Sequence, residues 1–180
     1  MESDLLTPIA GGARRVPDAL IRLIERFYRP AGLHVSRSPE AQYESAEYSA
    51  ARFGLNGHDI LFREAKTTPT KLGQFVTVWK RPEVGGIIAP LDVADDVAFV
   101  VVNVADATHQ GQFVFDHKTL AAKGVMSVNG KGGKRAIRVY PPWVTPIAKD
   151  AVKTQKWQLN HFIDLDDATD LQTLRKLFEA

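Results

Sequence analysis

Alternating hydrophobic and polar positions predict strands through the middle of the chain. Residues 46–55 and 58–67 carry strand-forming residues on either side of Asn56-Gly57, and this dipeptide between two such runs is the strongest short-range signal for a β-hairpin. The continuous apolar run at 97–104 predicts a strand buried on both faces. The same reasoning predicts further strands at 74–80, 111–115 and 135–140.

Apolar residues spaced as in an α-helix predict helices near the two ends of the chain. Pro17 and Asp18 begin a predicted helix that ends before Pro30, because proline suits the first turn of a helix and interrupts its interior. Asp116 and Asp170 are predicted N-caps of later helices. The pattern thus predicts helices at 118–123, 148–163 and after 170. Residues 31–45 are predicted to form a loop or broken segment around Pro39, in which 40–44 could form a short helical turn.

Helices flanking hairpins indicate the fold class. Tight hairpins favour a mixed, mostly antiparallel sheet of roughly five or six strands, so the predicted class is α+β. The length of 180 residues suits one domain. We expect a flexible leader over residues 1–15, which hold Gly11-Gly12 and no periodic pattern, and a single domain over 16–180.

The hairpin predicts a polar cluster through its register. If Asn56 and Gly57 form a two-residue loop, Ser49 lies opposite Glu64 and Glu47 lies opposite Lys66. Side chains two positions apart share a face of the sheet. One face would therefore be apolar near the turn and would carry, farther from it, Glu47, Ser49, Glu64 and Lys66.

This cluster has two interpretations. In the first, Glu47 and Lys66 form a cross-strand ion pair that contributes about 0.2–1 kcal/mol. In the second, the cluster is a nuclease-like site: Glu47 and Glu64 bind Mg²⁺, and Lys66 offsets charge that develops on a phosphate. Glu64 and Lys66 are then the candidate catalytic residues.

The amino-acid composition excludes several classes of protein. Hydrophobic residues make up 44% and charged residues 24% of the chain, which fits a soluble globular protein. No apolar run approaches the roughly 20 residues that a membrane span requires. The absence of cysteine excludes disulfides and thiol chemistry, and the acidic N-terminus does not resemble a secretory signal. We therefore expect a cytoplasmic protein with no membrane association.

The charge is distributed unevenly, although the net charge is only +2. Residues 117–156 hold nine basic residues and one acidic residue, whereas residues 82–116 hold six acidic residues and no lysine or arginine. A basic face of this kind attracts phosphates, so DNA or RNA is a candidate partner. The predicted contacts to nucleic acid or another anion are Arg63, Lys66, Lys71, Lys80, Arg81, Lys134, Arg135, Arg138 and Tyr140.

Four blocks of sequence resemble the MepB-like family. They are residues 62–81, 111–115, 134–143 and 155–158, and together they lie within residues 58–163. The resemblance implies a bacterial cytosolic protein with a link to multidrug efflux, and it implies no biochemical activity. Glu64-Ala-Lys66 also resembles the last motif of PD-(D/E)xK nucleases. The chain departs from that pattern because Asp59 lies on the opposite face of the same strand, so Glu47 would have to replace the missing acid.

Two functions follow from these observations. The first is a nucleic-acid-binding domain with a nuclease-like core. The alternative is a sensor of a small ligand or anion, or a protein-interaction module, in a stress or efflux setting. In the alternative, Arg63, Lys66 and Arg138 bind a carboxylate or phosphate group, and Trp79 and Tyr140 shape the pocket.

Overall fold

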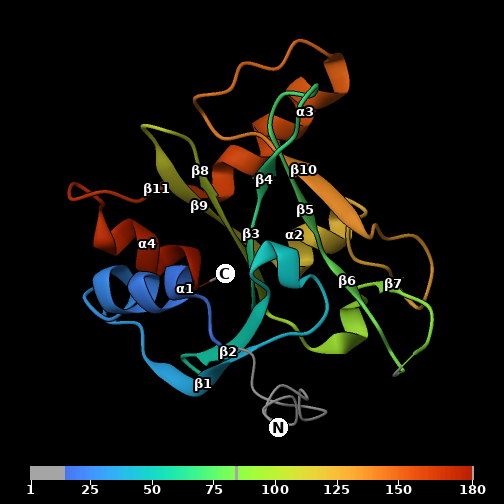
Figure 1. Ribbon diagram of the computed structural model, residues 1–180, viewed down its shortest axis with the longest axis horizontal. Coiled ribbons are helices and arrows are strands. Elements are labelled where there is room, and N and C mark those ends of the chain that lie inside the picture. The colour runs from blue at the N-terminus through green and yellow to red at the C-terminus, as the bar shows by residue number, and fades with distance from the viewer. Residues whose placement is uncertain (1–14, 84, 180) are drawn as a thin grey trace, which may run out of the picture.

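The computed structural model describes residues 15–83 and 85–179 and is built around one large sheet (Figure 1). The strand order is β1-β2-β3-β8-β9-β11. The β3 and β8 strands run parallel, and all other neighbours in this sheet are antiparallel. The strands are β1 (Val35–Ala41), β2 (Ala51–Leu55), β3 (His58–Glu64), β8 (Phe99–Ala105), β9 (Gln110–Asp116) and β11 (Phe162–Asp164). The predicted α+β class with a mixed, mostly antiparallel sheet is confirmed.

Helices cover one face of this sheet. Figure 1 shows α1 and α4 side by side, although they come from opposite ends of the chain. The helix α1 continues directly into a π-helical turn, η2. The elements of this layer are α1 (Asp18–Leu23), η2 (Ile24–Tyr28) and α4 (Leu171–Leu177).

A second layer covers the other face. It contains a three-stranded sheet of order β10-β5-β4, a two-stranded sheet of β6 and β7, and further helices. The strands are β4 (Lys66–Thr67), β5 (Gln74–Thr77), β6 (Trp79–Lys80), β7 (Ala89–Pro90) and β10 (Ala136–Val139). The helices of the chain between β7 and β11 are η4 (Val93–Asp95), α2 (His117–Ala122), α3 (Lys149–Gln158) and η5 (Leu159–His161).

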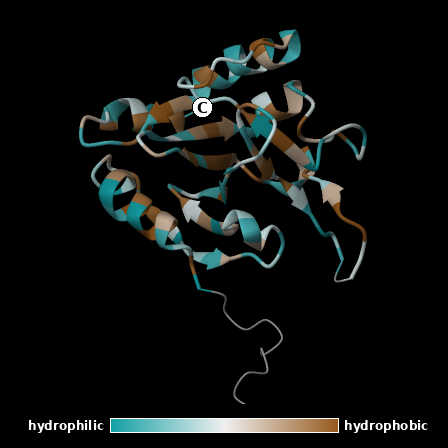
Figure 2. Ribbon diagram, turned by 45° about the horizontal axis from the view of Figure 1, so that its top comes forward, coloured by the Kyte–Doolittle hydropathy of each residue, from teal (hydrophilic) through white to brown (hydrophobic). Residues whose placement is uncertain are grey.

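The two layers enclose two hydrophobic cores, one on each face of the large sheet. Phe62 and Val101 point into the core beneath the helices, whereas Leu61 and Val102 point into the core beneath the second layer. Figure 2 shows the hydrophobic central strands between more polar outer segments. Burial of each large apolar side chain contributes about 1.5–3 kcal/mol. The prediction that the run at 97–104 is buried on both faces is confirmed for β8.

The predicted hairpin turn is confirmed, but its strands are shorter than expected. Asn56 and Gly57 have φ angles of 50° and 81°, and Leu55 pairs with His58. The ladder ends where Ala51 pairs with Phe62. The preceding residues form a 3₁₀ turn, η3 (Ala46–Tyr48), between two serines in the left-handed conformation. The expected pairing of Glu47 with Lys66 is therefore wrong, because the chain turns out of the sheet before it reaches Glu47.

Two other segments differ from the predictions. Residues 35–41 form the edge strand β1 rather than a loop; a polar segment with Pro39 is tolerated there because an edge strand has a neighbour on one side only. The helix predicted over 148–163 ends at Gln158, and 162–164 pairs with β9 instead. The predicted caps Asp116 and Asp170 are confirmed, since each carboxylate accepts a hydrogen bond from a backbone N–H of the following helix.

The leader expected over residues 1–15 lies, except for Arg15, outside the described residues. Across the described parts of the chain, every helix is too short or too polar to cross a membrane.

A buried chain of polar side chains crosses the helix-covered face of the sheet. The Tyr28 hydroxyl donates to Gln112 Oε1 at 2.8 Å, and Gln112 Nε2 donates to Asn103 Oδ1 at 2.6 Å. Tyr28 and Gln112 are fully buried. Burial raises the pKa of Tyr28 well above its usual value, against the smaller effect of its hydrogen bond with Gln112. Tyr28 therefore stays a neutral donor, and Gln112 satisfies the polar groups on either side of it.

Replacement of Gln112 by leucine will leave the Tyr28 hydroxyl without its acceptor and the Asn103 carbonyl without its donor. An unpaired buried polar group costs about 1–3 kcal/mol, so we expect the free energy of unfolding to fall by at least that amount in urea titrations. Gln110→Leu is the matched control, because Gln110 lies on the same strand and is exposed; it should change the stability by no more than about 0.5 kcal/mol.

Candidate nucleic-acid interface

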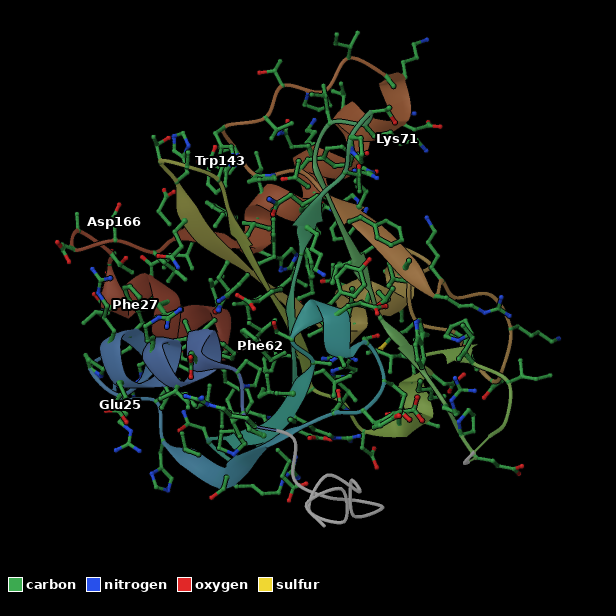
Figure 3. All side chains as sticks on the ribbon, viewed as in Figure 1. Glu25, Phe27, Phe62, Lys71, Trp143 and Asp166 are labelled. Atoms are coloured by element: carbon green, nitrogen blue, oxygen red, sulfur yellow. The ribbon has the colours of Figure 1, made fainter. Side chains whose placement is uncertain are left out.

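A basic and aromatic cavity lies within the second layer, between its three-stranded sheet and α3. Its volume is about 300 Å³, near the lower end of the range for ligand-binding sites. Among the residues that the structure describes, its wall contains four cationic side chains and no carboxylate. We call it the basic groove; its charged and aromatic residues are Lys71, Phe75, Lys123, Lys134, Arg138, Tyr140 and Trp157. Figure 3 shows Lys71 on the loop between β4 and β5, next to α3.

Strand alternation on β10 aims side chains into the basic groove. Ile137 and Val139 are buried in the core, so Arg138 and Tyr140 point to the other side. The Arg138 guanidinium lies 5.8 Å from the centre of the Phe75 ring and donates to the carbonyl of Leu72 at 3.2 Å. These contacts hold the guanidinium in place without neutralising it.

Gln158 joins α3 to the edge of β10. Its Oε1 accepts from the backbone N–H of Tyr140 at 2.9 Å, and its Nε2 donates to the backbone carbonyl of Arg138 at 3.0 Å. The side-chain amide thus replaces the neighbouring strand that β10 lacks on this edge. Gln158 is 1% exposed, so water does not compete for these hydrogen bonds. This contact fixes the distance between the two walls of the groove.

The glycine-rich loop before Lys134 is anchored at its base. The Asp92 carboxylate accepts from Ser127 Oγ at 2.7 Å and from the Gly130 N–H at 3.0 Å. Hydrogen bonds from the N–H of Ala94, from Ser127 and from the N–H of Gly130 lower the pKa of Asp92 to about 2. The carboxylate is therefore ionised at neutral pH and keeps the loop attached to the η4 segment.

The structure divides the predicted anion-binding residues among three places. Lys71, Lys134, Arg138 and Tyr140 line the basic groove. Another cavity, which shares no lining residue with the groove, is lined by Arg63, Lys80 and Arg81 together with Trp79. Arg135 is exposed just before β10 and lines neither cavity. Arg63 and Arg138, which were expected to bind the same anion in a sensor, line different cavities.

The predicted catalytic pair lies at the end of β3. Glu64 is half-buried and accepts a hydrogen bond from the Ser49 hydroxyl. Lys66 Nζ lies 5.2 Å from the centre of the Tyr48 ring. Glu64 thus contacts Ser49 at the end of η3, Lys66 contacts Tyr48 within η3, and Glu47 is exposed on the same 3₁₀ turn. Partial burial and the negative charge of Glu47 raise the pKa of Tyr48.

The described residues contain no group of three or more histidine, aspartate or glutamate side chains arranged to hold a metal ion. Magnesium binding by Glu47 and Glu64 stays a prediction. It would place one ligand on the 3₁₀ turn and the other on β3, rather than both on paired strands.

Sequence reasoning missed three members of the basic groove. Phe75, Lys123 and Trp157 come from β5, the end of α2 and α3. Lys123 Nζ lies 5.8 Å from the centre of the Trp157 ring, although 34 positions of sequence separate them. The excess of basic residues over 117–156 was the available signal, but it did not indicate which lysines meet an aromatic ring.

Replacement of Gln158 by leucine will leave the Tyr140 N–H and the Arg138 carbonyl without partners. We expect a loss of about 1–3 kcal/mol in the free energy of unfolding, measured by urea denaturation. Hydrogen exchange at the Tyr140 amide should also accelerate, because its acceptor is gone. Gln172→Leu on α4 is the control, since the Gln172 side chain is exposed. Equal stability of the two variants would contradict the role given to Gln158.

Comparison with known proteins gives a consistent assignment. The MepB-like family model matches residues 42–164. A crystal structure of MepB superimposes with a TM-score of 0.71 at 29% sequence identity, covering 84% of this chain and 99% of the other. No curated protein matches the chain. The family match includes every strand of the large sheet except β1, together with all strands of the second layer. The chain therefore belongs to the MepB-like family.

Proposed function

We propose that this protein binds nucleic acid through the basic groove. The observation that carries the proposal is the grouping of four cations with three aromatic rings in one cavity whose described lining residues include no carboxylate. None of the four cations forms an ion pair with a carboxylate of the described residues. Their charge is therefore available to phosphate groups.

The aromatic rings favour single-stranded nucleic acid. Phe75, Tyr140 and Trp157 are each partly exposed, so each ring has both a packed and an accessible portion. An unpaired base can stack on such a ring and contribute about 1–3 kcal/mol. A base inside a duplex cannot enter a concave site without first leaving its neighbours. The groove would thus hold phosphates with its cations and one or more unstacked bases with its rings.

Single-stranded DNA should bind with an affinity that falls steeply as salt rises. Each phosphate contact contributes about 0.7 to the slope of log K against log salt concentration for single strands. The variant Lys123→Ala/Lys134→Ala should therefore bind more weakly and show a slope reduced by about 1.4. Fluorescence anisotropy of labelled oligonucleotides at several salt concentrations measures both effects.

The control for these variants is Lys176→Ala, because Lys176 is exposed on α4, on the other side of the large sheet. It should leave affinity and slope unchanged. Absence of binding to single-stranded DNA, duplex DNA and RNA, or an affinity independent of salt, would contradict the proposal. Equal loss of affinity in the control and in the double variant would move the binding site away from the groove.

Cleavage of the bound strand is a further prediction, which depends on Glu64 and Lys66. If these residues act with Mg²⁺, wild type will shorten a labelled oligonucleotide in the presence of Mg²⁺. Glu64→Gln and Lys66→Ala will then lose that activity and will still bind. Cleavage by these variants at the wild-type rate would exclude both residues, and an intact oligonucleotide with Mg²⁺ and with Mn²⁺ would restrict the function to binding.

A further inference from the structure

Arg63 is a buried cation without a carboxylate partner. It lies on β3 and is 1% exposed. Its Nε donates to the carbonyl of Thr77 at 3.2 Å, and its Nη1 donates to Gln42 Oε1 at 2.8 Å and to the carbonyl of Phe62 at 2.9 Å. All three acceptors are neutral. The third nitrogen, Nη2, has no acceptor among the described residues.

This arrangement is energetically costly without a compensating anion. A buried charge costs several kcal/mol unless an opposite charge or a full set of hydrogen bonds compensates it. Burial lowers the pKa of Arg63 to about 10, while the carboxylate of Glu44 acts in the opposite direction. Glu44 forms no ion pair with Arg63 or with any other described residue. Arg63 still carries its positive charge at neutral pH.

Arg63 forms part of the wall of a cavity of about 290 Å³, which we call the Arg63 cavity. Its wall also contains the apolar residues Leu61, Leu91 and Val97 and the ring of Trp79. The Arg81 guanidinium lies 5.5 Å from the centre of the Trp79 ring. The cavity thus combines a fixed buried cation, an aromatic ring and an exposed second cation.

The other charged side chains of this wall already have ion-pair partners. Lys80 Nζ donates to both oxygens of Asp95, at 2.6 and 2.7 Å. Arg52 donates to both oxygens of Asp59, which also forms an ion pair with Arg37. Among the described residues of the wall, Arg63, Arg81 and Glu44 form no ion pair, and their charges sum to one positive charge.

We propose that the Arg63 cavity binds a small organic carboxylate with an apolar or aromatic body. The carboxylate accepts hydrogen bonds from Arg63 Nη2, the nitrogen left free by the protein. The body of the ligand packs against Trp79 and the aliphatic side chains, and Arg81 adds a second positive charge beside the ring. This site is separate from the basic groove, because the two cavities have no lining residue in common.

Benzoate is the probe, and benzamide is its uncharged counterpart of the same shape. Titration calorimetry on the full chain at constant ionic strength should show saturable binding of benzoate and none of benzamide. Acetate should bind more weakly than benzoate, because it lacks the body that contacts Trp79. Equal heats for benzoate and benzamide would overturn the proposal, since the carboxylate would then play no part.

Two variants test the site without removing Arg63, whose loss would disturb folding. Arg81→Ala should weaken benzoate binding several-fold, and Glu44→Gln should strengthen it, because a competing negative charge is removed. Arg29→Ala is the control, since Arg29 is exposed on the helix-covered side of the sheet, and it should leave binding unchanged. Unchanged binding in both test variants would overturn the proposal.

Crystals soaked in 4-bromobenzoate locate the ligand independently of any variant. An anomalous bromine peak inside the Arg63 cavity, with the carboxylate within hydrogen-bond distance of Nη2, is the expected result. Bromine sites found only at the basic groove or elsewhere on the surface would overturn the assignment. The result does not depend on nucleic-acid binding, so each proposal can fail without the other.

Discussion

The burial of β8 on both faces is the constraint on which the rest of the structure depends. Residues 99–104 are all buried, so the large sheet needs a covering layer on each side. The helices α1 and α4 supply one layer, and the small sheets with α2 and α3 supply the other. Both candidate cavities belong to the second layer or to its border with the large sheet. Their walls therefore exist because β8 has no solvent-exposed face.

The three-stranded sheet of the second layer has a free edge at β10, and the side chain of Gln158 supplies hydrogen bonds there. Within the described residues, the β10 strand has β5 as its only strand neighbour, so its other edge needs different hydrogen-bond partners. Gln158 provides a donor and an acceptor from α3. As a result, α3 stays at the edge of the strand instead of packing flat on the sheet. The space between them is the basic groove, so the contact that satisfies the free edge of β10 also forms a cavity lined by four cations.

Side chains alternate between the two faces of the sheet along β3, so two adjacent charged residues point in opposite directions. Arg63 and Glu64 are neighbours in the chain, yet Arg63 points with Leu61 toward the second layer and Glu64 points to the other face with Phe62. The two residues therefore cannot share one site. Arg63 contributes a buried positive charge to the Arg63 cavity, while Glu64 lies half-buried at the end of the helix-covered face, beside Ser49. The adjacent residues Arg63 and Glu64 thus belong to two different sites, one on each face of the large sheet.

Local signals were sufficient to predict much of the architecture. The Asn56-Gly57 turn, the caps Asp116 and Asp170 and the two-sided burial of residues 97–104 all follow from neighbouring residues, because backbone conformation and side-chain period act over a few positions. The sequence also singled out Lys71, Lys134, Arg138 and Tyr140, and the structure places all four in the lining of the basic groove; their contact with an anion stays a prediction.

Contacts between distant segments decided the rest. The edge strand β1 forms because β2 offers hydrogen bonds, although its mostly polar residues and Pro39 do not favour a strand. The edge strand β11 contains only three residues, too few to give a pattern, and forms because β9 offers hydrogen bonds. Glu47 leaves the sheet because Ser45 and Ser49 adopt the left-handed conformation, which the alternating pattern does not reveal. The meeting of Lys123 with Trp157 and the burial of Arg63 depend on how the second layer packs on the large sheet. Sequence alone thus determined which side chains carry charge, and only tertiary packing decided which of them share a cavity, because that depends on residues far apart in the chain.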